Sequence, residues 1–255
     1  MFFQPPQSLT NREHSIWDLS KFSLLDMLRC SRGLQRATSE AKTFGEASSA
    51  IVRYLYDESR KSDTDAHQCA LIRFYKTSAF AKLGSAERDF VDAQMAGVSL
   101  DAETRVLTMM ATVGAEEAWC DRMRSAGHLA IPLPSVEIVE RAPMIAGLIR
   151  ALGIDIADVV APNPVFMDRE AAKTYDVFHV EKAAGSVFIP AQDDFVMPYG
   201  IQSVIGFGGL LADGELFAVV MFTTVPVPPA AAGRFRNIAL DVKAITYPLA
   251  ERTFQ

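Results

Sequence analysis

The first quarter of the chain repeats its apolar positions at the spacing of an α-helix. No proline occurs over residues 15–59, and apolar side chains return at alternating three- and four-residue steps. We expect one helix that ends near Gly45 and a second helix over residues 46–58. The narrow stripe of the first helix fits packing on a core or a seam between two chains, and both interpretations stay open. This stripe includes Leu24, Met27 and Leu34.

Apolar runs that predict β-strands begin after the acidic, turn-rich residues 61–65. Two such runs cover residues 69–75 and 105–113, with a short helix expected near residues 87–95 between them. The elements expected next are a helix over 115–125, an extended turn over 131–134, two short helices divided by Pro143 and ended by Gly153, and a strand over 174–180. A connection over residues 181–200 follows, and connections of this length usually cover a site or move.

The clearest local signal is a β-hairpin in the last third of the chain. Two nearly uncharged apolar runs, residues 201–211 and 216–225, flank Asp213-Gly214, a residue pair typical of a tight turn with positive φ. We expect such strands to be central and covered by helices. Two prolines at 228–229 then begin a final helix with one apolar stripe along its length. With the N-terminal stripe we expect it to form a homodimer interface, through Phe235, Ile238, Val242 and Ile245.

This order of elements resembles a GAF domain. The likeness is strongest over residues 195–250, where Tyr199 to Phe222 form a strand, a short turn and a second apolar strand before the amphipathic helix. Three segments are similar to the GAF-like modules attached to bacterial histidine kinases and related signalling proteins: 69–76, 131–151 and 188–243. The resemblance implies an α+β fold, with a GAF-like antiparallel sheet and helices on both faces. It further implies terminal helices that pair between subunits, and small helices and loops that roof a ligand pocket.

We expect this GAF-like domain to cover residues 61–255, after an N-terminal helical extension in residues 1–60, and to end in the C-terminal helix. The likeness does not extend to two ligand motifs of the family. The chain lacks the Asn-Lys, Phe and Asp-Glu set of cyclic-nucleotide-binding members. Phe178 precedes His179 and Gly127 precedes His128, so the Cys-His pair of bilin-carrying members is missing too. Neither ligand is expected, and the cofactor stays unknown.

Composition and charge narrow the classes of partner. The chain has 255 residues, and its net charge of −6 disfavours a nucleic-acid partner. The longest apolar stretch, residues 204–229, is interrupted by acidic residues at its turn and is not expected to span a membrane. Three cysteines lie far apart without the spacing of a metal site, so we expect reduced thiols in a cytoplasmic protein: Cys30, Cys69 and Cys120.

Two groups of side chains are candidates for a ligand site. One lies around a basic turn and offers an aromatic ring, a guanidinium and an imidazole, from Trp119, Arg122 and His128. The other is the best polar and aromatic lining beneath the long connection and comprises Tyr175, His179 and Tyr199. Each group also has an ordinary explanation, since the first fits a solvated basic turn and His179 fits a histidine satisfied in the core.

The hypothesis that follows is a noncatalytic sensory or regulatory protein of bacterial signal transduction. It binds an unidentified small molecule between the sheet and the covering loops, dimerises through its terminal helices and signals to another protein chain. Two alternatives stay open. One is a thiol-dependent enzyme with Cys120 or Cys69 as nucleophile and His128 or His179 as base. The other is a structural or partner-binding GAF-like module whose pocket is empty.

Overall fold

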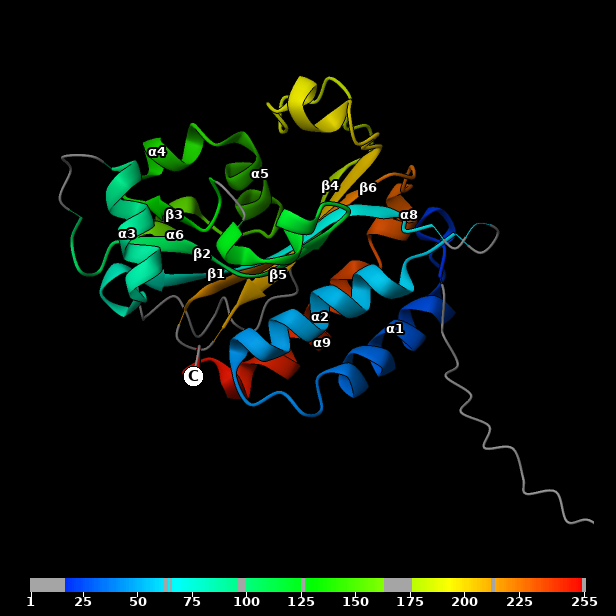
Figure 1. Cartoon of the computed structure of the whole chain (residues 1–255), viewed down its shortest axis with the longest axis horizontal. Helices are drawn as coiled ribbons and strands as arrows, with labels where there is room; N and C mark the ends of the chain where they lie inside the picture. Colours follow the sequence, from blue (N-terminus) through cyan, green and yellow to red (C-terminus); the bar gives the residue numbers. More distant parts are fainter. Residues whose placement is uncertain are drawn as a thin grey trace, which may run out of the picture.

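An antiparallel β-sheet organises the protein (Figure 1). The computed structural model describes residues 17–61, 64, 66–95, 100–124, 127–162, 176–211 and 214–253. Within these residues the sheet has six strands in the order β3-β2-β1-β6-β5-β4, and neighbouring strands are antiparallel. The strands are β1 (Cys69–Ala79), β2 (Arg105–Gly114), β3 (Ala130–Leu133), β4 (Phe178–Val180), β5 (Ser203–Leu210) and β6 (Leu216–Thr223).

The predicted hairpin lies in the inner part of the sheet. β5 and β6 pair from Ser203 opposite Thr223 to Leu210 opposite Leu216, and every residue of both strands is buried. Gly214 has a φ of 74°, a conformation that glycine adopts without strain. β6 also pairs with β1, so strands from the two halves of the chain lie side by side. Both faces of the hairpin are covered, which explains why its two runs are apolar throughout.

Helices from both ends of the chain cover one face of the sheet, seen below the strands in Figure 1. They are α1 (Leu24–Ala37), α2 (Phe44–Glu58), α8 (Pro229–Ala232) and α9 (Phe235–Thr246). Ser23 begins α1 with a capping box, since its hydroxyl accepts from the amide of Asp26 and its own amide donates to that carboxylate. The Thr43 hydroxyl caps α2 in the same position. The apolar faces of these helices share one core with the sheet, including Ile72, Phe74, Phe207 and Met221.

Short helices and the long connection cover the opposite face, through a second core cluster. They are α4 (Val136–Glu140), α5 (Pro143–Ala151) and α6 (Ile156–Val160), while α3 (Ser85–Gln94) packs beside β3. Pro143 divides α4 from α5, as predicted, and occupies the first turn of α5, where its missing amide costs no hydrogen bond. Gly153 follows α5 with a φ of 71°. The expected fold class is therefore confirmed: α+β, with an antiparallel sheet and helices on both faces.

Several local predictions were wrong. The break between α1 and α2 lies at residues 38–43, and Gly45 belongs to the first turn of α2. The helix expected after residue 114 is replaced by two 3₁₀ turns, η3 (Glu117–Cys120) and η4 (Arg122–Arg124). The extended turn expected at 131–134 is the edge strand β3, where Pro132 lies opposite Val106. An edge strand tolerates proline because one side of its backbone carries no ladder hydrogen bonds.

The apolar stripes that we expected between two chains instead fill the core of one chain. Leu34, Phe235, Ile238 and Val242 are at most 1% exposed, and Met27 is 8% exposed. Ile245 is partly buried against the same cluster. For these residues the core-packing interpretation holds, because they could not reach a second copy without opening the core. Leu24 differs, since 61% of its surface is exposed.

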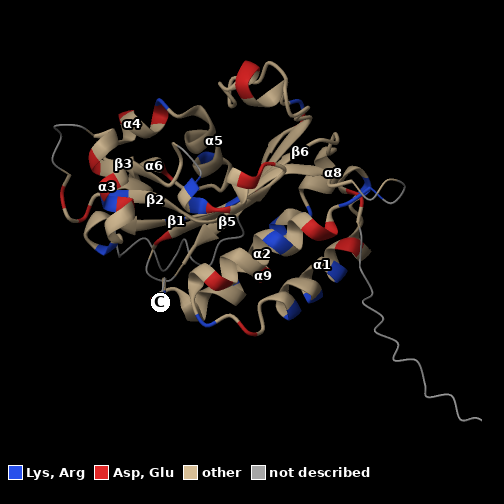
Figure 2. Cartoon of the chain, viewed as in Figure 1, with Lys and Arg blue, Asp and Glu red and all other residues tan. Residues whose placement is uncertain are grey.

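The N-terminal helices and the sheet belong to one hydrophobic cluster. Although we expected residues 1–60 as an extension, α1 and α2 contribute Leu34, Phe44 and Ile51 to the core beneath β1 and β6. Charged residues lie mainly on the outer faces of these helices, and the strands carry few (Figure 2). Among the helices of the described residues, none combines the length and the apolar character that a membrane span requires.

Candidate functional site

A cavity of about 470 Å³, lined by both polar and apolar residues, lies at one end of the sheet. Its walls come from β1, β2, the start of α3, the turn before β6 and the segment that follows α9. The polar side chains that line it include Lys76, Ser78, Lys82, Glu87, Thr108 and Glu215. A cavity of this size accommodates a small organic molecule.

The strand register explains why these residues meet. Lys76 lies opposite Thr108 of β2 on one side and opposite Phe217 of β6 on the other. Because side chains alternate between the faces of a strand, Lys76 and Ser78 follow Phe74 toward the layer of α2 and α9. Glu215 precedes β6 directly and so reaches the same end of the sheet.

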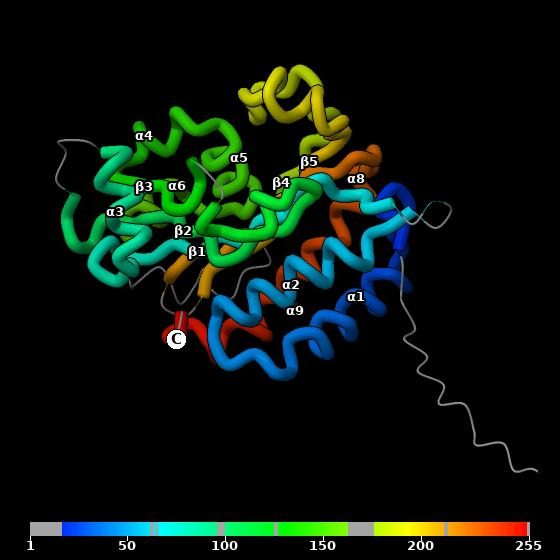
Figure 3. The backbone as a smooth tube through the Cα atoms, in the orientation of Figure 1, coloured from blue at the N-terminus to red at the C-terminus, as the bar shows by residue number. Residues whose placement is uncertain are grey.

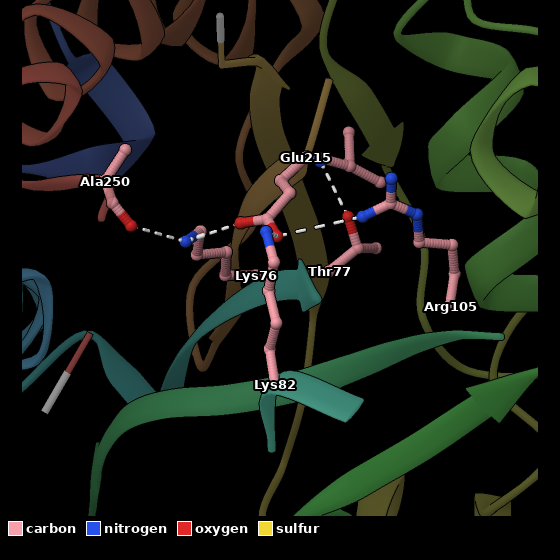
Figure 4. A network of polar contacts seen from close by, with 7 residues as sticks. Lys76, Thr77, Lys82, Arg105, Glu215 and Ala250 are labelled. Atoms are coloured by element: carbon pink, nitrogen blue, oxygen red, sulfur yellow. Dashed lines mark hydrogen bonds and ion pairs between the residues drawn. The ribbon is translucent and has the colours of Figure 1, made fainter. Parts of the chain in front are cut away.

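Lys76 and Glu215 form a buried ion pair at the wall of the cavity (Figure 4). Both side chains are only 2% exposed, and Nζ of Lys76 lies 2.5 Å from Oε2 of Glu215. The same ammonium donates to the carbonyl oxygen of Ala250 at 2.8 Å and lies 4.9 Å from the ring centroid of Phe44. A carboxylate, a carbonyl and an aromatic face together compensate for the water that this buried charge has lost.

Glu215 faces three cationic side chains. Besides Lys76, its Oε1 lies 3.7 Å from Nζ of Lys82 and 3.7 Å from Nη1 of Arg105. Arg105 is 13% exposed, whereas Lys82 is 67% exposed and extends toward solvent. Glu215 is therefore one carboxylate among three cations, of which Lys76 and Lys82 line the cavity and Arg105 does not.

The segment after α9 closes part of the cavity and also caps α2. Ala250 accepts the hydrogen bond from Lys76. The carbonyl oxygens of Arg252 and Thr253 accept from the amides of Phe44 and Gly45, at 2.7 and 3.0 Å. These are the first two residues of α2, whose amides have no partner inside the helix. Figure 3 shows this C-terminal end of the chain beside the start of α2. One wall of the cavity is therefore joined to both terminal helices.

An aromatic cluster lies on the opposite face of the sheet and includes two of the predicted site residues. The rings of Trp119 and Tyr199 have centroids 4.5 Å apart, and Phe195 contacts both at 5.7 and 5.8 Å. Phe195 also packs edge-on against Phe222 of β6 at 5.0 Å. Partial burial and the nearby Glu116 carboxylate raise the pKa of the Tyr199 phenol. These side chains join η3 to the covering connection, and their mutual contacts are those of packing.

The other predicted site residues do not join this cluster. Arg122 pairs with Glu87 at 2.7 Å and donates to the carbonyl oxygen of Met109 at 3.2 Å. His128 is exposed. His179 donates from Nε2 to the carbonyl oxygen of Val227 at 2.8 Å, while its neighbours in β4 face the other side of the sheet. Tyr175 lies outside the described residues.

The three thiols differ in their exposure to solvent. Cys30 and Cys69 are buried, and burial raises the pKa of both, that of Cys69 to about 12. Cys120 is exposed and its sulfur lies 3.4 Å from the carbonyl oxygen of Gly114. Within the described ranges, no group of three or more His, Cys, Asp and Glu side chains could hold a metal ion.

Reasoning from the sequence missed Lys76, Thr108 and Glu215. A signal was present, because Arg73 and Lys76 interrupt an apolar run that predicts a buried strand. A charge in such a run needs a buried partner, and Glu215 stands at the turn of the most apolar hairpin of the chain. The pairing of Lys76 with Glu215 depends on the strand order, and the sequence does not reveal that order.

No protein-family model and no curated protein matches this chain. Among solved structures it is similar to two GAF domains of phosphoenolpyruvate-protein phosphotransferases. The Acinetobacter domain matches at 12% identity and a TM-score of 0.42, with 88% of this chain and 97% of that chain covered. The Coxiella burnetii domain matches at 12% identity and a TM-score of 0.44, with 89% and 96% covered.

The chain is also similar to the phytochrome photosensory core module of Stigmatella aurantiaca. There the identity is 12% and the TM-score 0.41, with 89% of this chain and 37% of that chain covered. At such identities and TM-scores the similarities say nothing of what this chain binds. Two GAF domains are among the solved structures that the chain is similar to.

Proposed function

We propose that the chain is a noncatalytic sensory or regulatory module of a signalling protein, GAF-like in fold, which binds a small molecule. In this proposal, the cavity between the sheet and the segment after α9 is the binding site. Its volume suits a small organic ligand. Its lining of hydroxyls, ammonium groups and carboxylates suits recognition by charge and hydrogen bonding.

The observation that carries this proposal is the double attachment of residues 250–253. They form a wall of the cavity, and their carbonyl oxygens bind both Lys76 and the first turn of α2. A molecule in the cavity therefore touches the segment that holds α9 and α2 together. A ligand that prefers one position of this segment stabilises that arrangement of the terminal helices, by its difference in affinity for the two arrangements.

A thiol-dependent enzyme is less well supported. An attacking sulfur must be a thiolate, and burial makes the thiolates of Cys30 and Cys69 unfavourable. Cys120 is exposed, and its thiol donates to the backbone carbonyl oxygens of Gly114 and Glu116. A carbonyl cannot take a proton from a thiol, so these contacts do not activate it.

We further propose that the protein forms a homodimer through α1. Leu24, Leu25 and Leu28 of α1 are 61%, 55% and 49% exposed. In this proposal they form the interface between the two copies, instead of the apolar stripes of α1 and α9 that are buried in the core. Light scattering after size-exclusion chromatography should find a dimer, which the double substitution Leu24→Glu and Leu28→Glu converts to a monomer with an unchanged far-UV circular dichroism spectrum. The matched control is Met197→Glu, on a residue that is 65% exposed in the covering connection. A monomeric wild-type protein, or an equal effect of the control, contradicts the dimer.

Hydrogen–deuterium exchange tests the sensory function. The wild-type chain is screened by thermal shift against succinate, citrate, inorganic phosphate, putrescine, adenosine and glucose, and exchange is measured with each probe that stabilises it. We expect slower exchange in residues 250–253 and in the first turn of α2, because both are fixed by the occupied cavity. Helix α5, on the other face, is the internal control. The proposal fails if no probe stabilises the protein, or if a bound probe leaves the exchange of those two segments unchanged.

A further inference from the structure

The charges around the cavity are not balanced by the described residues. Lys76, Lys82 and Arg105 surround the single carboxylate of Glu215, at 2.5, 3.7 and 3.7 Å. Glu87, the next carboxylate in the lining, is paired with Arg122 at 2.7 Å. Around Glu215 itself the cationic groups therefore outnumber the carboxylate, and two of these three cations, Lys76 and Lys82, line the cavity.

Glu251 is the remaining acidic residue of the lining, and it does not cancel this excess. It lies in the segment after α9 and is exposed. An exposed carboxylate is hydrated and screened, so it affects the buried wall less than the 2%-exposed Lys76 does.

A second, independent observation concerns the Thr108 hydroxyl. Thr108 lines the cavity and is 3% exposed, and its Oγ1 has no hydrogen-bond partner among the described residues. A buried hydroxyl without a partner has lost its hydrogen bond to water and gained none in return, which a bound acceptor would correct. The register places Thr108 directly opposite Lys76, so this hydroxyl and the buried ammonium belong to the same part of the wall. Ser78 adds a second hydroxyl to the lining.

We propose that the cavity binds a small organic anion through a carboxylate or phosphate group. The anionic oxygens accept hydrogen bonds from the Thr108 hydroxyl and from the Lys82 ammonium, which swings inward from its exposed position. The anion offsets the excess positive charge at Glu215, and it supplies the partner that the Thr108 hydroxyl lacks. This inference rests on the proposed function, and it deepens it by naming the chemical class of the ligand.

The same features disfavour other ligand classes. A polyamine would bring further positive charge close to Lys76, Lys82 and Arg105. A neutral sugar could satisfy the Thr108 hydroxyl, but it would leave the charge excess unchanged. A large apolar ligand would bury the ion pair and the hydroxyls against a surface that cannot bond them.

Calorimetric titration of the full chain tests the anion site. The probes are succinate, citrate, inorganic phosphate and glycerol 3-phosphate, with putrescine and glycerol as charge controls, in a Tris-chloride buffer at constant ionic strength. We expect binding by at least one of the anions and by neither control. Comparison of succinate with glycerol 3-phosphate shows which of the two anionic groups is preferred.

Two variants test the assigned residues. Thr108→Val keeps the shape of the side chain and removes the hydroxyl, and we expect it to weaken anion binding by roughly tenfold. Thr112→Val is the matched control, because Thr112 lies on the same strand, is 7% exposed, also lacks a partner among the described residues and does not line the cavity. Lys82→Met should weaken binding and flatten its dependence on salt, while Lys61→Met on an exposed residue should not.

The outcomes separate this inference from the proposed function. Binding of putrescine or glycerol that Thr108→Val abolishes would overturn the anion assignment and leave the sensory site intact. Equal affinities of the Thr108→Val and Thr112→Val proteins for the anion would overturn the assigned site. Anion binding that depends on Thr108, without a change of exchange in residues 250–253, would support the anion site and refute the sensory proposal.

Discussion

The buried ion pair of Lys76 and Glu215 should stabilise the protein only as a pair. Each side chain is 2% exposed, so removal of one charge leaves the other buried without its nearest partner. Such a loss typically costs about 3–5 kcal/mol of unfolding free energy. Because Glu215 keeps Lys82 and Arg105 at 3.7 Å, we expect Lys76→Met to cost about 3 kcal/mol, at the lower end of that range.

The double variant shows how strongly the two charges are coupled. Glu215→Gln alone should also cost about 3 kcal/mol, because the Lys76 ammonium keeps only the Ala250 carbonyl and the Phe44 ring. Lys76→Met with Glu215→Gln leaves no unpaired charge between them. We therefore expect a total loss of about 4 kcal/mol rather than 6, which is a coupling of about 2 kcal/mol.

Urea unfolding of the four proteins, followed by far-UV circular dichroism, measures this coupling. Equal m-values across the set show that the variants expose the same surface on unfolding. The control cycle uses Arg124→Met and Glu117→Gln, an ion pair at 2.8 Å whose side chains are 54% and 86% exposed. Its coupling should stay below about 1 kcal/mol. Additive losses at Lys76 and Glu215, or a coupling no larger than that of the control pair, would refute the reasoning.

Three further predictions concern the thiols and the close packing of two strands. Burial raises the pKa of Cys69 to about 12, so this thiol keeps its proton in the folded state at a pH where it loses it in the unfolded state. The unfolding free energy should therefore fall as pH rises above about 9, which urea titrations at pH 8 and pH 10 measure. A constant unfolding free energy would contradict this prediction. Iodoacetamide should modify exposed Cys120 in the native protein and reach Cys69 only after unfolding, as mass spectrometry can show. Gly208→Ala should lower the unfolding free energy by about 1–3 kcal/mol in a urea melt, because the added Cβ would lie 2.1 Å from the Phe217 carbonyl oxygen. An unchanged urea midpoint would show that β5 and β6 can separate at this position.

Much of the fold could be predicted from patterns that are local in the sequence. The hairpin of β5 and β6 was predicted because two apolar runs flank a turn pair, and Pro143 correctly divided two helices. β3 was missed because Pro132 argues against a strand unless the strand lies at an edge. That position is set by the strand order, so no local pattern predicts it.

The apolar stripe of α9 illustrates a limit of periodicity. Phe235, Ile238 and Val242 return at helical spacing, and the same spacing describes a helix on its own sheet and a helix on a second chain. The structure shows that they are buried in one chain. The candidate site was missed for a related reason, since Lys76 and Glu215 meet only through the pairing of β1 with β6.

β3 and β4 lie at the two edges of the sheet that the described residues form. β3 has four residues, one of them Pro132, and β4 has three. A proline removes a backbone donor, and strands this short present few groups for an incoming chain, so the sheet is a poor template for edge-to-edge growth. Edges this short, one of them containing a proline, therefore disfavour aggregation through the pairing of sheets.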